Sequence, residues 1–325
     1  MAILVVSENW GGNFKKSTYE AVSYANEIAK QMGTSTTALS IGNVSNETLQ
    51  SLGKYGATKV LHAQHDKLNN FNVQVYASVI AEAAKKEGSQ LIILSNTFAG
   101  KSLSPRVAMK LQAGLVTDAI ALPSSVSPFV VRRKIFSGKA FSNVELTTAV
   151  KILALAPNSF HLVEANASAT IENFTPSFND ADFVSQHKEF KKAGGAISIT
   201  EAEVVISGGR GLKGPENWGM VEDLAKILSA GTACSKPVAD MGWRPHHEHV
   251  GQTGIAIAPN LYIAIGISGA IQHLAGVNSS KVMVAINNDP EAPFFKAADY
   301  GIVGDAFEIV PKLIEAFKEY KSSLN

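Results

Sequence analysis

The sequence of 325 residues has little cysteine and no excess of charge of either sign. Its single cysteine, Cys234, excludes a disulfide within the chain and a metal cage built from thiolates, and it fits best with a reducing compartment. Lys and Arg total 29 against 28 Asp and Glu, so the formal net charge is +1. A balanced charge favours neither nucleic acid nor an anionic membrane as a partner.

Long apolar runs are also missing. The stretch from Ile255 to Ile265 is interrupted by Pro259 and Asn260, and it is shorter than the roughly 20 residues of a membrane-spanning helix. Met1 to Glu8 lacks the basic start of a signal peptide, and its apolar run has the length of a core strand. We therefore expect a protein that is not embedded in a membrane and has no signal or transit peptide. The expected location is the cytoplasm of a bacterium, or the mitochondrial matrix if the protein is eukaryotic.

The composition and the first half of the chain indicate an α/β protein. Hydrophobic residues make up 46% of the chain and charged residues 18%, which is typical of soluble globular proteins. Short β-branched runs alternate with amphipathic stretches, and Gly33, Gly56 and Gly88 follow three of those stretches, where a left-handed helix end is expected. This alternation predicts a parallel sheet covered by helices. The expected strands are 3–7, 36–41, 59–63 and 91–95, and the expected helices are 17–32, 47–55, 73–86 and 105–112.

The rest of the chain predicts a second domain. The helical period disappears from residue 129 to 155, where 129–132, 140–147 and 150–155 read as antiparallel strands added to the first sheet. Residues 157–195 are irregular. Alternation then returns, with expected strands at 203–207, 261–266 and 282–287 and expected helices at 216–228, 269–274 and 305–320. We expect two domains, 1–192 and 193–325, each a mostly parallel sheet flanked by helices, with the second doubly wound.

A glycine-rich turn opens the second domain. Gly209, Gly211 and Gly214 have the G-x-G-x-x-G spacing of dinucleotide folds, between an expected strand and an expected helix. Glycines there let backbone amides approach a phosphate, which the start of the helix attracts. Arg210 favours a ligand, because a guanidinium binds phosphate or stacks on a ring. The same spacing occurs in tight turns that bind nothing, so both interpretations stay open.

Two further turns carry polar residues where strands end. Ser268 follows a buried strand and is suited to cap the next helix, whose first amides can face an anion. Gln272 and His273 then lie close to whatever occupies that turn, although a lone histidine there can also be structural. Asn287 and Asp305 follow later strands, at the edge where open α/β sheets bind ligands. Their alternative roles are a turn-forming Asn and a helix-capping Asp.

These segments resemble the alpha subunit of electron-transfer flavoproteins. The most specific part is the run from Leu261 to Gly276, which resembles the signature of that family. The stretches 207–214, 251–254, 284–293 and 298–305 are also similar, and in the first domain 63–66 and 100–108 match more loosely. The resemblance implies one FAD, held mainly by the second domain. The positions it assigns to FAD are Arg210, Ser235, Lys236, Val250, Gly251, Gln252, Thr253, Ser268, Gly269, Ala270, Ile271, Gln272, His273, Asn287, Asp305 and Ala306.

The resemblance also implies a role for most of these positions. Arg210 lies against the flavin or its phosphate side, and Ser235 binds the cofactor. Gln252 and Thr253 contact the flavin edge or ribityl chain, and the stretch from Ser268 to Gln272 cradles the pyrophosphate and ribityl region. His273 hydrogen-bonds the pyrimidine end of the ring, where a donor stabilises the charge of the reduced flavin. Asn287 and Asp305 anchor the adenosine half.

One position departs from the family pattern. Many members have an arginine after the serine that matches Ser235, placed over the flavin ring, whereas this sequence has Lys236. Lysine keeps the positive charge but lacks the planar fork and the stacking face of arginine. We therefore expect FAD binding to persist and the stabilisation of the reduced ring to differ.

Two other features have plainer explanations. The three histidines His246, His247 and His249 are too close in sequence to form one rigid ligand face, so we expect a polar loop over the cofactor rather than a metal site. Cys234 has no nearby catalytic partner in the sequence, so it is expected to pack in the core.

The resemblance implies an electron carrier without a substrate-transforming reaction of its own. Its expected partners are a beta subunit, which pairs with the first domain in a heterodimer, flavoprotein dehydrogenases such as acyl-CoA dehydrogenases of fatty acid beta-oxidation as donors, and a quinone oxidoreductase or other acceptor. One alternative is an FAD- or NAD-dependent oxidoreductase with its own small-molecule substrate, for which the sequence offers no clear acid–base pair. A nucleotide-binding regulatory module is a third alternative. Whether the beta subunit holds AMP or a second FAD stays open.

Overall fold

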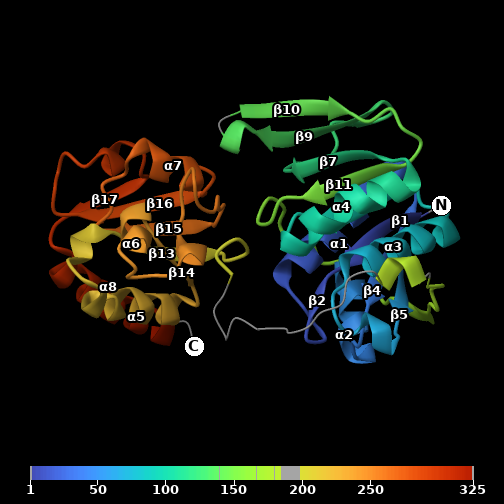
Figure 1. Cartoon of the computed structure of the whole chain (residues 1–325), viewed down its shortest axis with the longest axis horizontal. Helices are drawn as coiled ribbons and strands as arrows, with labels where there is room; N and C mark the ends of the chain where they lie inside the picture. The colour runs from blue at the N-terminus through green and yellow to red at the C-terminus, as the bar shows by residue number, and fades with distance from the viewer. Residues whose placement is uncertain (1, 139, 166, 179, 184–197, 324–325) are drawn as a thin grey trace. The chain divides into compact units, whose positions relative to one another are not determined.

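The computed structural model describes residues 2–138, 140–165, 167–178, 180–183 and 198–323. The chain divides into two compact units, residues 1–135 with 141–191 and residues 136–140 with 192–325 (Figure 1). The expected boundary between residues 192 and 193 lies within 184–197, outside the described residues. Both units are α/β with mostly parallel sheets, which confirms the expected fold class.

The first unit is built on one large sheet with helices on both faces. The strand order is β10-β9-β7-β11-β6-β1-β4-β5-β12, and β8 pairs with β9. The strands are β1 Ala2–Ser7, β4 Ser35–Ile41, β5 Lys59–Ala63, β6 Leu91–Ser95, β7 Gly114–Ala119, β8 Ser125–Val126, β9 Phe129–Ile135, β10 Ala140–Glu145, β11 Lys151–Leu155 and β12 Thr170–Asn173, with a separate hairpin of β2 Asn9–Trp10 and β3 Asn13–Phe14. The helices are α1 Lys16–Met32, α2 Asn46–Gln50, α3 Val73–Glu87 and α4 Phe98–Leu111.

The central strand β1 shows why this sheet is covered on both sides. Ile3 and Val5 point into the core under α1, and Leu4 and Val6 point into the opposite core under α3 and α4. Strands buried on both faces read as continuous apolar runs, which is how the sequence identified them. The helices pack their apolar faces onto these two layers, and that burial is the main favourable term in folding.

Two expectations for the strands of the first unit were wrong. Residues 150–155 were expected to add an antiparallel strand, but β11 lies between β6 and β7 and pairs parallel with both. Residues 157–195 were expected to be irregular, but β12 pairs parallel with the edge strand β5. The sequence gives no local signal for strand direction or for a short edge strand, because both depend on partners distant in the chain.

Helix α4 is longer than expected because Pro105 lies inside it. The sequence interpretation placed the start of a helix at Pro105, whereas the helix begins at Phe98. The Thr97 side chain accepts a hydrogen bond from the Gly100 N–H at 3.1 Å and caps the helix. A Cβ on Gly100 would lie 1.8 Å from the carbonyl oxygen of Ser95, so only glycine fits at this turn.

The second unit has a five-stranded parallel sheet in the order β14-β13-β15-β16-β17. Helices α5 and α8 cover one face together with α6, and α7 covers the other. None of the helices in the described ranges combines the length and apolar character needed to cross a membrane. The elements are β13 Val204–Gly208, α5 Gly219–Leu228, β14 Gly231–Cys234, α6 Lys236–Asp240, β15 Leu261–Ile265, α7 Ile271–Val277, β16 Val282–Asn287, β17 Tyr300–Val303 and α8 Ala306–Ser323.

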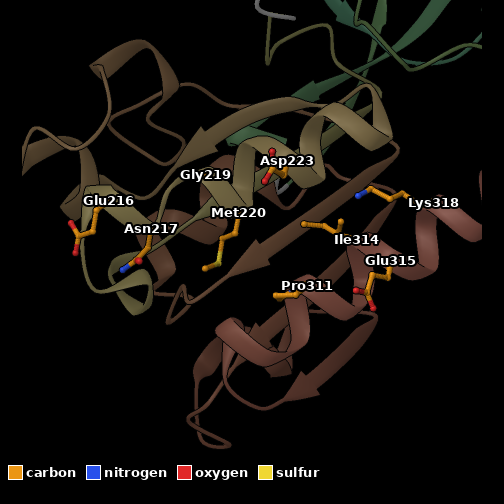
Figure 2. Close-up of a pocket in the computed structure, with 9 residues that line it drawn as sticks. All are labelled: Glu216, Asn217, Gly219, Met220, Asp223, Pro311, Ile314, Glu315 and Lys318. Atoms are coloured by element: carbon orange, nitrogen blue, oxygen red, sulfur yellow. The ribbon is translucent and has the colours of Figure 1, made fainter.

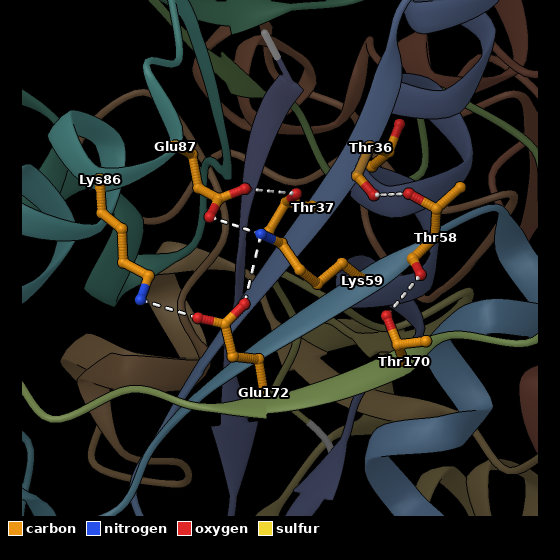
Figure 3. A network of polar contacts seen from close by, with 8 residues as sticks. All are labelled: Thr36, Thr37, Thr58, Lys59, Lys86, Glu87, Thr170 and Glu172. Carbon is orange, nitrogen blue, oxygen red and sulfur yellow. Dashed lines mark hydrogen bonds and ion pairs between the residues drawn. The ribbon is translucent and has the colours of Figure 1, made fainter.

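A polar network ties the edge of the first sheet to α3 (Figure 3). The Lys59 ammonium lies 2.6 Å from the Glu87 carboxylate, whose side chain is 8% exposed. A second carboxylate, Glu172 of β12, lies 3.5 Å from Lys59 and 2.7 Å from Lys86. Burial acts to lower the pKa of Lys59, but Glu87 and Glu172 outweigh it and raise the pKa. Lys59 therefore neutralises a nearly buried charge, whereas Lys86 binds an exposed one.

This difference can be tested with two matched substitutions. Lys59→Met should lower the free energy of unfolding by about 1–3 kcal/mol. The Glu87 carboxylate would lose its cation and, among the described residues, keep only the Thr37 hydroxyl as a side-chain donor. Lys86→Met should cost about 0–1 kcal/mol, since its partner is 41% exposed. Urea titration of both variants measures the difference, and equal losses would contradict this account of the network.

Candidate functional site

The second sheet reverses its direction of winding between β13 and β15. Strand β13 leads through α5 to β14 on one side, and β15 then lies on the other side of β13. Open α/β sheets bind their ligands outside the carboxyl ends of the strands at such a point. The loops that follow these two strands, Gly209–Gly214 and Gly266–Ala270, therefore form the candidate site.

The two loops touch through their glycine backbones. The Gly209 N–H donates to the Ile265 carbonyl at 2.9 Å, and the Gly211 N–H donates to the Gly266 carbonyl at 3.0 Å. A Cβ on Gly209 would lie 2.2 Å from the Gly266 oxygen, and one on Gly211 would lie 2.7 Å from the Gly266 Cα. The N–H groups that the sequence interpretation directed toward a phosphate are therefore bonded within the protein. The glycines instead allow one loop to pack on the other.

The second loop keeps its own N–H groups open. Helix α7 was expected to start at Gly269 with Ser268 as its cap, but it starts at Ile271 after Ala270, without a side-chain cap. Gly269 has φ +83°, and the Ser268 carbonyl accepts a hydrogen bond from the Phe294 N–H at 3.0 Å. Among the described residues, none accepts a hydrogen bond from the backbone N–H of Ser268, Gly269 or Ala270. Open donors on glycine-rich backbone suit an anionic ligand group.

A second backbone segment is fixed beside the start of α7. The Gln252 N–H donates to the Gln272 carbonyl at 2.7 Å. A Cβ on Gly276 would lie 2.4 Å from the Gly251 nitrogen, so this contact also requires glycine. The structure thereby places Gly251 and Gln252, with their chain neighbours Val250 and Thr253, next to Gln272 and His273.

His273 is the buried polar side chain of this group. It is 7% exposed, and its Nε2 lies 2.8 Å from the Tyr262 hydroxyl. Its Nδ1 makes no hydrogen bond to any of the described residues. Burial, and to a lesser degree His249, lowers the pKa of His273 to about 4, although the backbone of Val250 acts to raise it. His273 is therefore neutral at pH 7, with one ring nitrogen left for a ligand.

Three other expected residues follow β13 and β14. Arg210 is exposed directly after Gly209, and Lys236 is exposed at the start of α6. Ser235, directly before Lys236, is buried, and its N–H donates to the Gly208 carbonyl at 3.1 Å. Two cations thus lie at the carboxyl ends of adjacent strands, at the same sheet edge as the open amides.

Asn287 and Asp305 make the local hydrogen bonds that the sequence left as alternatives. The Asn287 side chain donates to the Ile267 carbonyl at 3.1 Å and accepts from the Asp289 N–H at 3.0 Å. Asp305 accepts from the Phe307 N–H at 2.9 Å and precedes Ala306, the first residue of α8. Asn287 therefore holds the loop after β15 in place, whereas Asp305 supports the start of α8.

The histidine-rich loop, residues 246–249, is held by hydrogen bonds from Arg244. Glu248 accepts two hydrogen bonds from Arg244, at 2.7 and 2.8 Å, and His249 is buried. In the ranges that the structure describes, no group of three or more His, Cys, Asp or Glu side chains is placed to hold a metal ion. Cys234 is buried in the core, which raises the pKa of its thiol to about 12.

Figure 2 shows a separate hollow between α5 and α8. Met220, Pro311 and Ile314 line it together with charged residues such as Asp223 and Glu315. None of the residues expected to bind FAD lines this hollow. It is therefore distinct from the candidate site at the sheet edge.

Sequence reasoning missed Tyr262 and Phe294. The Tyr262 hydroxyl contacts His273, and the Tyr262 and Phe294 rings stack with centroids 6.2 Å apart. The available signal was a single tyrosine within the otherwise aliphatic strand Leu261–Ile265, because a fully buried tyrosine hydroxyl needs a partner.

Comparison with known proteins places this site in a family. Residues 3–179 match the model described as the electron transfer flavoprotein domain, and residues 198–278 match the electron transfer flavoprotein FAD-binding domain. The chain belongs to the electron transfer flavoprotein family, as an alpha subunit. The segments 250–253 and 268–273 both lie within the matched FAD-binding domain. Membership confirms the expected electron-transport role and FAD as the cofactor.

Relatives match over nearly the whole length. The chain is 39% identical to the electron transfer flavoprotein subunit alpha of Bacillus subtilis, over 98% of this chain and 97% of the relative. It is 37% identical to the subunit of the same name from Syntrophomonas wolfei, over 96% and 98%. The probable mitochondrial subunit alpha of Caenorhabditis elegans is also 37% identical, over 96% and 92%.

The glycine contact between the two loops can be tested directly. In Gly211→Ala the new Cβ meets the Gly266 backbone at 2.7 Å, and relief of about 1–3 kcal/mol of strain should displace the loop after β15. FAD affinity should fall roughly tenfold or more. Gly219→Ala is the control, because nothing lies within 4 Å of its Cβ position. FAD titration of both variants tests the contact, and equal affinities would contradict its role in the site.

Proposed function

We propose that the chain holds one FAD at the carboxyl edge of the second sheet and carries electrons in a heterodimer with a beta subunit. The observation that supports this most strongly is the row of N–H groups at Ser268, Gly269 and Ala270, which make no hydrogen bond to the described residues. They precede His273, whose Nδ1 likewise has no partner there. When bound, FAD supplies reversible electron transfer. The residues at this edge bind and orient it.

The polar groups fall into regions that fit the parts of FAD. The amides of Ser268–Ala270 suit the pyrophosphate, and Asn287 and Asp305 would hold the adenosine side. Gln252 and Thr253, which lie beside Gln272, would contact the ribityl chain or ring edge. His273 would donate a hydrogen bond to the pyrimidine end of the ring. Val250, Gly251 and Ile271 would complete the walls, with Ala306 near the adenosine.

The two exposed cations would add charge complementarity. Arg210 lies in the loop that supports the pyrophosphate cradle, and Lys236 starts α6 at the next strand end. A fixed positive charge near the ring stabilises the negative charge that arises on reduction. Lys236 would do so without the stacking face of an arginine.

The proposed partners follow from a carrier role. Electrons would arrive from flavoprotein dehydrogenases such as acyl-CoA dehydrogenases and leave to a quinone oxidoreductase or another acceptor. The first unit would pair with the beta subunit, and the chain would transform no substrate of its own. A carrier needs a tuned cofactor and access for its partners rather than an acid–base pair beside a substrate.

The test is reconstitution. Co-expression with the beta subunit should give a 1:1 heterodimer with one FAD in this chain, and flavin absorbance should bleach when an acyl-CoA dehydrogenase and its substrate are added. The dehydrogenase without its substrate is the control. A heterodimer without flavin would refute the FAD site, whereas bound flavin that no dehydrogenase reduces would refute only the proposed donors.

A second prediction concerns the redox role of His273. A hydrogen bond to a charged group contributes about 1.5–3 kcal/mol, and about 1.4 kcal/mol corresponds to 59 mV in a one-electron couple. His273→Leu should therefore lower the first reduction potential of the flavin by about 60–120 mV. His161→Leu removes an exposed histidine of the first unit, far in sequence from the expected FAD-binding residues, and should leave the potential unchanged. Spectroelectrochemical titration measures both, and an unchanged potential in His273→Leu would show that this ring does not contact the flavin.

A further inference from the structure

Tyr262 has the geometry of a side chain that acts through His273. It lies on β15, is fully buried at 0% exposure, and places its hydroxyl 2.8 Å from Nε2 of His273. The Phe294 ring stacks on the Tyr262 ring at an interplanar angle of 10° and also lies 6.0 Å from the His273 ring. Solvent therefore has no access to the phenol, and its hydroxyl bond is a fixed part of the interior.

The number of protons on Tyr262 and His273 limits the hydrogen bonds that the two side chains can make. Burial raises the pKa of Tyr262, so the phenol stays protonated, and burial lowers the pKa of His273 to about 4, so the imidazole stays neutral. The phenol has one proton to donate, and the neutral imidazole carries one N–H. If the phenol donates to Nε2, the imidazole proton must be on Nδ1. If the phenol accepts instead, the proton is on Nε2 and Nδ1 can only accept.

Acid and base strength favour the first arrangement. A phenol is a stronger acid than the N–H of a neutral imidazole, and the unprotonated imidazole nitrogen is a stronger base than the phenol oxygen, so Tyr262 donates to Nε2. With Nε2 accepting this bond, the imidazole proton is on Nδ1, which makes no hydrogen bond to the described residues.

We propose that Tyr262 is a positioning residue that donates to Nε2 of His273 and thereby fixes the Nδ1–H tautomer, which makes His273 a hydrogen-bond donor at the cofactor site. This inference rests on the proposed FAD site. The proton chain runs from Tyr262 to His273 and ends at Nδ1, which makes no hydrogen bond to the described residues. A donor strengthens its bond as negative charge forms on the flavin, whereas an acceptor would oppose that charge.

The experiment uses the FAD-loaded heterodimer with ¹⁵N-labelled histidine. NMR should show Nδ1 of His273 protonated and Nε2 unprotonated, with the signals assigned by their loss in His273→Leu. In Tyr262→Phe the Nδ1–H population should fall, and the equilibrium of the first reduction should shift about tenfold toward oxidised flavin, which is 59 mV for one electron. Tyr24→Phe is the matched control, because Tyr24 is another fully buried tyrosine with one hydroxyl bond, 2.8 Å to the Ala121 carbonyl in the first unit. It should change neither measurement.

Each outcome decides one point. A proton on Nε2 in the unmodified protein overturns the proposal, and this spectrum needs no variant, so it decides even if Tyr262→Phe does not fold. An unchanged tautomer and potential in Tyr262→Phe, alongside a shifted potential in His273→Leu, would retain His273 in the flavin site and overturn the role of Tyr262. If the heterodimer binds no FAD, the proposed function fails, and the tautomer measured in the flavin-free heterodimer still tests the proton chain.

Discussion

The second unit depends on a contact between two backbones without side chains. Gly209 and Gly211 donate hydrogen bonds to the carbonyls of Ile265 and Gly266, at distances that leave no room for a Cβ on either side. This contact fixes the loop after β15, while the N–H groups of residues 268–270 make no hydrogen bond within the part of the chain that the structure describes. Fixed, unpaired donors cost stability in the empty protein, and a bound anion recovers it. The glycines therefore act on the cofactor indirectly, because they hold in place the loop that we propose binds it.

In the first unit, the polar groups at the corresponding edge of the sheet are bonded within the protein. Its winding reverses between β1 and β6, and polar residues follow both strands. There the Thr97 hydroxyl donates to the Glu8 carboxylate at 2.5 Å, and the Ser95 hydroxyl donates to the Ser17 carbonyl at 2.8 Å. The polar groups at this edge of the first sheet therefore hydrogen-bond within the protein. In the second unit, the N–H groups of residues 268–270 make no hydrogen bond to the described residues. Two sheets of one class thus differ in how they use the same edge, which is consistent with a single FAD held by the second.

Sequence reasoning predicted what depends on local pattern. The apolar runs of β1, β4, β5 and β6 and the glycines after three helices identified the parallel sheet, because burial on both faces leaves a clear signal. The direction of β11 and the pairing of β12 could not be read in the same way, since both depend on strands far away in the chain.

The candidate site shows the same division. The spacing of Gly209, Gly211 and Gly214 predicted amides directed toward a phosphate, but the spacing does not reveal that the backbone of Ile265 and Gly266 lies opposite and accepts from Gly209 and Gly211. The proximity of Gln252 to Gln272 and the bond from Tyr262 to His273 join separate segments, so no single motif contained them. Asn287 has a local and a tertiary bond, and the sequence indicated only the first.

The most direct test of this account is a crystal structure of the heterodimer with FAD bound. The account predicts that oxygens of the pyrophosphate lie within hydrogen-bond distance of the N–H groups of Ser268, Gly269 or Ala270. Gly209 and Gly211 should still donate to Ile265 and Gly266, as they do in the chain alone. A pyrophosphate bound instead to the amides of Gly209 and Gly211, with the contact between the two loops broken, would contradict it.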